Sequence, residues 1–143
     1  MQTIKPFIEN VKSAGLLTII LASVAGYITN SVWSYIPAVS KIFYGDAPVA
    51  PLSSMPFSVF AWYLANIFIN TIALSMFIHK KGAVNGLAVG LIVGLFFGGT
   101  AILGTYLGAG APLPPGEFIL ASLISNVLFY CVPAALVGHL RKQ

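Results

Sequence analysis

Asparagine side chains stand well inside the long apolar stretches of this sequence, and they are the residues best suited to bind another molecule there. Asn66 and Asn70 are four residues apart, so on a helix they share one face. An unpaired amide is unfavourable in hydrocarbon, so these side chains must meet other polar groups. We expect them either to join helices by hydrogen bonds, which we favour, or to line a polar pocket. The candidate pocket residues are Asn30, Ser34, Asn66, Asn70, Ser122 and Asn126, with Ser31, Tyr35 and Ser125 as further members.

Groups that catalyse reactions or hold metals are few and scattered. The three carboxylates all lie outside the apolar stretches, at Glu9, Asp46 and Glu117. His79 and His139 fall at the same ends of two apolar stretches, where we favour ordinary interfacial positions over a weak metal or proton site. Cys131 stands alone in an apolar run, which is typical of a small buried side chain. With no nucleophile beside a base and no ligand set, we predict no enzyme activity, no cofactor and no metal site.

The composition indicates a protein dissolved in lipid. Of the 143 residues, 58% are hydrophobic and 7% are charged, whereas soluble domains carry about a quarter charged residues. The net charge of +4 includes no basic cluster long enough to bind nucleic acid. We therefore expect membrane lipid as one partner, and other membrane chains or further copies of this chain as the others.

Four apolar stretches are long enough to cross a bilayer, which takes about 20 residues each. They cover residues 14–36, 57–78, 83–107 and 118–140. Lys5 and Lys12 followed by LLTIILASVAG resemble a signal peptide, but the apolar character continues to Ile36, so we expect a retained helix. The prediction is an all-α polytopic membrane protein in which residues 1–143 form one compact four-helix transmembrane domain.

The basic residues predict the orientation of these helices. With four spans, one side of the membrane receives Lys5, Lys12, Lys80, Lys81, Arg141 and Lys142. Only Lys41 falls on the other side. Because Lys and Arg prefer the cytoplasmic side, we expect both termini in the cytoplasm, in the bacterial plasma (inner) membrane. Counted from the outer ends at about 1.5 Å per residue, Asn30, Asn66 and Asn126 then lie roughly 10–15 Å deep.

The connections between the spans differ in length. His79, Lys80 and Lys81 form a very short link, so we expect spans 57–78 and 83–107 to be antiparallel neighbours. Residues 37–56 are longer and carry several prolines, Pro48 and Pro51 among them. We expect a proline-stiffened loop on the bilayer surface, and the alternative is a lid over a cavity between helices.

Glycine recurs at every fourth position of the third span, at Gly82, Gly86, Gly90, Gly94 and Gly98. In lipid, such a row lets two helix backbones approach closely. The short link favours span 57–78 as the partner helix. We favour packing within one chain, with contact between copies of the chain as the alternative. In the fourth span, Pro133 removes one backbone hydrogen bond and frees the carbonyl of Phe129.

The segment ASVAGYITNSVWSYIPAVSKIF resembles the DUF1761 group of small bacterial four-helix membrane proteins, whose function is unknown. That group carries a tryptophan-tyrosine-serine-proline pattern, to which Trp33, Ser34, Tyr35 and Pro37 correspond, with one extra residue before the proline. The glycine-lysine-tryptophan stretch that follows in the group is missing here. The resemblance covers about a sixth of the chain and implies a fold but no activity.

Two functions fit these features. The scarcity of internal chemistry and the glycine row favour a non-catalytic structural or accessory subunit of a membrane assembly. The alternative is a small oligomeric transporter or channel, with the amides lining a path for a small polar solute.

Overall fold

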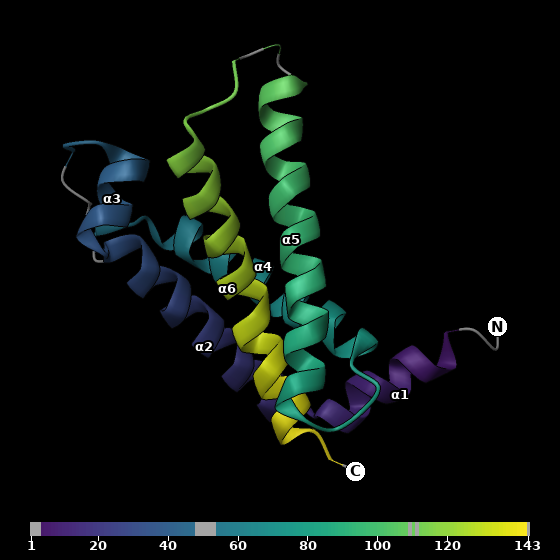
Figure 1. Ribbon diagram of the computed structural model, residues 1–143. Helices are drawn as coiled ribbons and strands as arrows, with labels where there is room; N and C mark the ends of the chain where they lie inside the picture. The colour runs from purple at the N-terminus through teal and green to yellow at the C-terminus, as the bar shows by residue number, and fades with distance from the viewer. Residues whose placement is uncertain (1–3, 48–53, 109, 111, 143) are drawn as a thin grey trace.

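The computed structural model describes residues 4–47, 54–108, 110 and 112–142, without the side chain of Thr105. Residues 48–53, which include Pro48 and Pro51 of the predicted loop, lie outside the described part. The described residues form α-helices and no strands (Figure 1). The helices are α1 (Lys5–Ala14), α2 (Leu16–Tyr35), α3 (Pro37–Tyr44), α4 (Phe57–Phe77), α5 (Ala83–Leu107) and α6 (Gly116–Leu140).

Four helices are long and apolar enough to cross a membrane, which confirms the predicted all-α, four-span fold. They cover Leu16–Tyr35, Phe57–Phe77, Ala83–Gly104 and Gly116–Leu140. These ranges differ from the predicted spans by only a few residues at each end, because uninterrupted hydropathy determines both. The chain is a multi-pass membrane protein.

Helix α6 occupies the centre of the bundle. It packs along α5 and α2, and it also contacts α1, α3 and α4. In Figure 1, α6 (yellow-green to yellow) lies between α2 and α5, and α4 passes behind it. The arrangement therefore depends on which residues α6 presents on each of its sides.

Toward α5, α6 meets a row of glycines whose missing side chains leave room for its backbone. A Cβ atom added at Gly90 would lie 2.6 Å from Cα of Cys131, and one at Gly94 would lie 2.9 Å from Cα of Val127. A Cβ atom at Gly86 would collide with the carbonyl group of Ala134. Gly86, Gly90 and Gly94 thus lie against the α6 backbone, and Gly98 lies against side chains of α6.

The predicted partner for the glycines, span 57–78, is wrong. Helices α4 and α5 scarcely touch, so they are not packed neighbours despite their short link. Gly82, at φ 134°, donates its N–H to the carbonyl of Gly138 at 2.8 Å and so ties the start of α5 to the end of α6. A short link limits the distance between two helix ends but not the face that each helix turns toward the other.

Toward α2, α6 presents Pro133, which is buried against Gly26. A Cβ atom at Gly26 would lie 2.6 Å from Cγ of Pro133 and 3.6 Å from the carbonyl oxygen of Phe129. The proline therefore occupies the space that a side chain on α2 would need. The glycine in α2 lets the two helices cross closely at this point.

Two short helices flank the spans. Gly15, at φ 80°, separates amphipathic α1 from α2, a break that the prediction of one continuous span from residue 14 did not anticipate. Residues 37–44, predicted as loop, form α3, which starts at Pro37 because proline suits the first turn of a helix. Phe43 of α3 packs edge-to-face on Phe118 of α6, with ring centroids 5.5 Å apart.

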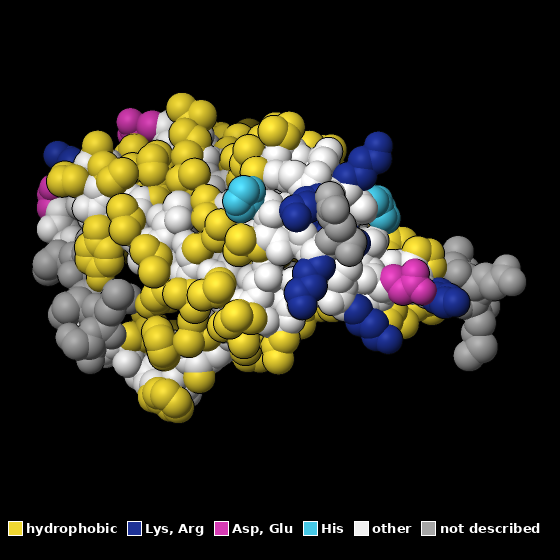
Figure 2. Space-filling view, turned by 90° about the horizontal axis from the view of Figure 1, so that it is seen from below, with side chains coloured by type: hydrophobic (Ala, Val, Ile, Leu, Met, Phe, Trp, Pro, Cys, Tyr) yellow, Lys and Arg dark blue, Asp and Glu magenta, His cyan; other side chains and the backbone are white. Residues whose placement is uncertain are grey.

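The buried core lies toward one end of the bundle, where α2 begins and α4 and α6 end; we call this the basic end. Its buried hydrophobic residues are Ala14, Ile19, Ala22, Leu74, Ile78, Tyr130, Ala134 and Val137. Figure 2 looks at this end and shows Lys, Arg and His side chains gathered together, with hydrophobic side chains over the neighbouring surface. Two cavities border this core on the side away from the basic end, and Tyr130 lines one of them.

Candidate functional site

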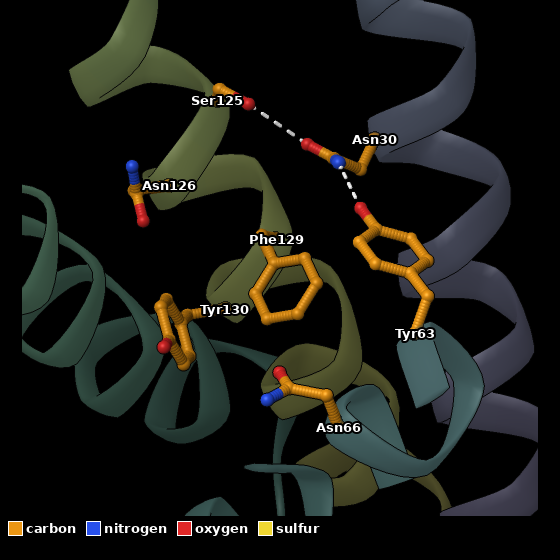
Figure 3. Close-up of a pocket in the computed structure, with 7 residues that line it drawn as sticks. All are labelled: Asn30, Tyr63, Asn66, Ser125, Asn126, Phe129 and Tyr130. Atoms are coloured by element: carbon orange, nitrogen blue, oxygen red, sulfur yellow. Dashed lines mark hydrogen bonds between the residues drawn. The ribbon is translucent and has the colours of Figure 1, made fainter. Parts of the chain in front are cut away.

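A cavity of about 260 Å³ lies among α2, α4 and α6 (Figure 3). Its lining is mostly amides, hydroxyls and aromatic rings and includes no charged side chain. The lining residues are Asn30, Tyr63, Asn66, Ser125, Asn126, Phe129 and Tyr130. We call this space the amide cavity.

Asn30 joins the three helices that surround the amide cavity. Its Nδ2 donates a hydrogen bond to the hydroxyl oxygen of Tyr63 in α4 at 2.5 Å. The hydroxyl of Ser125 in α6 donates to Oδ1 of Asn30 at 2.9 Å. Both bonds are drawn in Figure 3. One amide in α2 is thus held from both sides by neutral partners.

The amides of α4 pair with each other. Nδ2 of Asn70 donates to Oδ1 of Asn66 at 2.8 Å and to the backbone carbonyl of Asn66 at 3.0 Å. Asn66 lines the cavity and is also exposed at the bundle surface. A polar amide therefore stands on the open side of the cavity, at a level of α4 that lies within its apolar span.

In α6, Nδ2 of Asn126 donates to the backbone carbonyl of Ser122 at 2.9 Å. Asn126 also approaches α5, because a Cβ atom at Gly98 would lie 3.0 Å from its Cβ. Its amide thus lies between the cavity and the glycine row.

The structure separates the six predicted pocket residues. Asn30, Asn66 and Asn126 line the amide cavity, and Asn70 supports it through Asn66. Ser34 lies one turn beyond Asn30, toward the C-terminal end of α2 and farther from the basic end. It therefore lines a different pocket. Ser122 does not line the amide cavity and contributes only its backbone carbonyl to Asn126.

Aromatic residues of the amide cavity were missed by the sequence analysis, whereas Ser125 had been included. Tyr63 precedes Asn66 by three residues, which places the two on neighbouring positions of one helix face. That spacing was the available indication. Phe129 and Tyr130 look like ordinary apolar positions in sequence, and only the packing of α6 turns them toward the cavity.

A second pocket of about 340 Å³ lies beside the amide cavity, among α2, α3 and α4. It is rich in aromatic rings, and we call it the aromatic pocket. Its lining residues are Tyr27, Asn30, Ser31, Ser34, Tyr35, Tyr44, Met55, Val59, Trp62 and Tyr63. Tyr44 comes from α3, so the segment predicted as a surface loop or a lid forms part of a pocket wall.

A third polar group, at the basic end, is structural in character. Nη2 of Arg141 donates to Oδ1 of Asn10 at 2.6 Å, and Nδ2 of Asn10 lies 2.8 Å from both the Met76 carbonyl oxygen and Nδ1 of His79. Burial lowers the pKa of the Arg141 guanidinium from its ordinary value. Within the described residues, no group of three His, Cys, Asp or Glu side chains is placed to hold a metal ion.

No protein-family model, curated protein or solved structure matches this chain. The resemblance to the DUF1761 group therefore stays a prediction. The site must be interpreted from its chemistry, which is that of two neighbouring uncharged cavities able to donate and accept hydrogen bonds.

Proposed function

We propose that this chain is a non-catalytic structural or accessory subunit of a membrane assembly. The exposed amide of Asn66 is the observation that carries this proposal. Apolar helix faces can lie against lipid, whereas an amide within the membrane span is stabilised by a polar partner on a neighbouring helix. The partner is a helix of another membrane chain, or of a second copy of this chain, lying over the open side of the amide cavity.

The separation of α4 from α5 supports the same proposal. Because α4 packs mainly on α1 and α2, it leaves the side of α6 that faces the amide cavity incompletely covered. Because α4 and α5 do not pack against each other, they leave room for a helix of another chain. The proposal extends to orientation, with both termini in the cytoplasm of a bacterium, because the positively charged residues gather at the basic end.

Photocrosslinking tests the subunit proposal. A benzoyl-phenylalanine at position 66 should capture a protein chain in native membranes, whereas the same group at Ala65 should capture lipid. Ala65 is the matched control because it is exposed at the same depth on a different face of α4. Equal yields of protein adduct at the two positions would contradict the proposal. The absence of a protein adduct at both positions would also contradict it. Blue-native electrophoresis of the adduct distinguishes a foreign chain from a second copy.

A second function, passage of a small polar solute through an oligomer, is favoured by one observation. The amide cavity is uncharged and borders a second cavity, so a neutral molecule meets hydrogen-bonding groups over two successive spaces. Flux of glycerol into liposomes should fall when Asn66→Leu and Asn126→Leu are introduced together. Unchanged flux would remove the amides from any such path.

A further inference from the structure

The amide cavity and the aromatic pocket share a wall made of two residues. Asn30 and Tyr63 line both spaces, and they are hydrogen-bonded to each other across α2 and α4. Asn30 is also held by Ser125 of α6, so its amide is fixed on the α6 side. The phenol of Tyr63, in contrast, belongs to α4, which packs less extensively on the central helix. The movable half of this wall is therefore Tyr63.

The two spaces differ in the groups they offer to a molecule. The aromatic pocket presents ring faces from Tyr27, Tyr44 and Trp62 together with hydroxyls, which suits C–H surface alongside hydrogen bonds. The amide cavity presents carboxamides and a serine hydroxyl, which suit a molecule that both donates and accepts. Neither lining contains a charged side chain, so an ion would lose its hydration without compensation.

We propose that the hydrogen bond between Asn30 and Tyr63 is a gate between these two spaces, and that it admits a small uncharged polyol or amide. When Tyr63 swings away, Nδ2 of Asn30 loses its acceptor, and an oxygen atom of the solute takes that place. The solute thus replaces the phenol, and the half-buried amide is never left unpaired. This inference rests on the second candidate function and names the solute class and the residue that controls its entry.

Cysteine accessibility tests the gate in reconstituted vesicles, in a chain that carries Cys131→Ser. Asn126→Cys places a thiol in the amide cavity, and Ser34→Cys places one in the aromatic pocket. Adding Tyr63→Phe removes the gating hydroxyl but keeps the ring. We expect a small water-soluble thiosulfonate to modify position 126 about fivefold faster, the population shift that the loss of one ordinary hydrogen bond produces. The rate at position 34 should stay unchanged, which also shows that the variant is folded.

Tyr27→Phe is the matched control. The Tyr27 ring packs against that of Tyr63, with centroids 5.6 Å apart, but its buried hydroxyl has no hydrogen-bond partner in the described residues. Its removal should leave the rate at position 126 unchanged. Equal rates at position 126 with and without the Tyr63 hydroxyl, or equal acceleration by Tyr27→Phe, would overturn the gate.

The solute class is tested in the same vesicles. Glycerol and urea should slow modification of position 126 in the Tyr63→Phe variant, whereas equal osmolarity of sodium chloride should not. Protection by the salt and by neither solute would overturn the assignment. These outcomes are separable from the transport proposal. If the liposomes show no flux but the accessibility and protection results are as expected, the gate controls a binding site and not a transport path.

Discussion

Arg141, one residue beyond α6, donates from Nη2 to Oδ1 of Asn10 in α1 at 2.6 Å. Asn10 in turn lies 2.8 Å from both the Met76 carbonyl oxygen and Nδ1 of His79. A single buried amide thus connects α1, the end of α4 and the end of α6. Since Arg141 is only 7% exposed, this neutral acceptor stabilises a cation that has left water.

Asn10→Ala should therefore destabilise the bundle. The substitution leaves the Arg141 guanidinium without its acceptor, and hydrogen bonds to charged groups contribute about 1.5–3 kcal/mol. We expect the free energy of unfolding in detergent to fall by about 2 kcal/mol. Glu9→Ala, an exposed neighbour on α1, should change it by less than about 0.5 kcal/mol. Equal effects of the two changes would show that Asn10 has no special part in holding the basic end together.

Gly90→Ala should separate α5 from α6. The added methyl group would lie 2.6 Å from Cα of Cys131, and backbone cannot yield as a flexible side chain does. We expect a loss of about 1–3 kcal/mol, the usual range for overpacking. Gly99→Ala is the matched control, since nothing lies within 4 Å of the Cβ position there. Thermal unfolding in mild detergent measures both, and a tolerant position 90 would mean that α5 and α6 do not pack as closely as the structure has them.

Gly26→Ala should be harmful only when Pro133 is present. The new methyl group would meet Cγ of the proline ring at 2.6 Å, so the variant should lose stability. Pro133→Ala removes that ring and allows the backbone bond to Phe129 to form. A double-mutant cycle on unfolding free energies should therefore give a coupling of about 1 kcal/mol or more. Additive effects would indicate that α2 and α6 can shift apart at this crossing.

The orientation predicted from charge is tested by labelling in intact cells. In a Cys131→Ser background, Asp46→Cys should react with a membrane-impermeant maleimide added outside, and Lys80→Cys should react only after lysis. Both positions are exposed, so access to the thiol reflects the side of the membrane and not burial. The reverse labelling pattern would show that the protein lies in the membrane with the opposite orientation.

The four spans were predictable because hydropathy depends on each segment alone. Boundaries at Tyr35, Phe57 and Ala83 agree with the predicted limits within one residue or coincide with them. The spacing of the glycines likewise indicated a close helix contact. Their partner was not predictable from loop length, because the rotation of α5 about its own axis is set by contacts with Gly138 and Cys131, far along the chain.

The candidate site was only partly predictable for a similar reason. Asn30 and Asn126 stood out because amides are rare in apolar segments, whereas Tyr63 resembled an ordinary interfacial aromatic. Ser34 fell in the neighbouring pocket because a difference of four residues is one helical turn, about 6 Å along the axis. Depth can be counted from a sequence, but which of two adjoining spaces a side chain enters depends on where the facing helices diverge.

Among the helices of the described residues, the central helix α6 comes last along the chain. Three glycines of α5 pack on the α6 backbone, and Pro133 of α6 occupies the space left by Gly26 of α2. During synthesis the earlier segments can enter the bilayer, and α4 can pack on α1 and α2, but α5 lacks its main packing partner until α6 emerges. A ribosome that stalled before residue 116 would thus leave α5 without its packing partner, with its row of glycines facing lipid, as a substrate for membrane quality control.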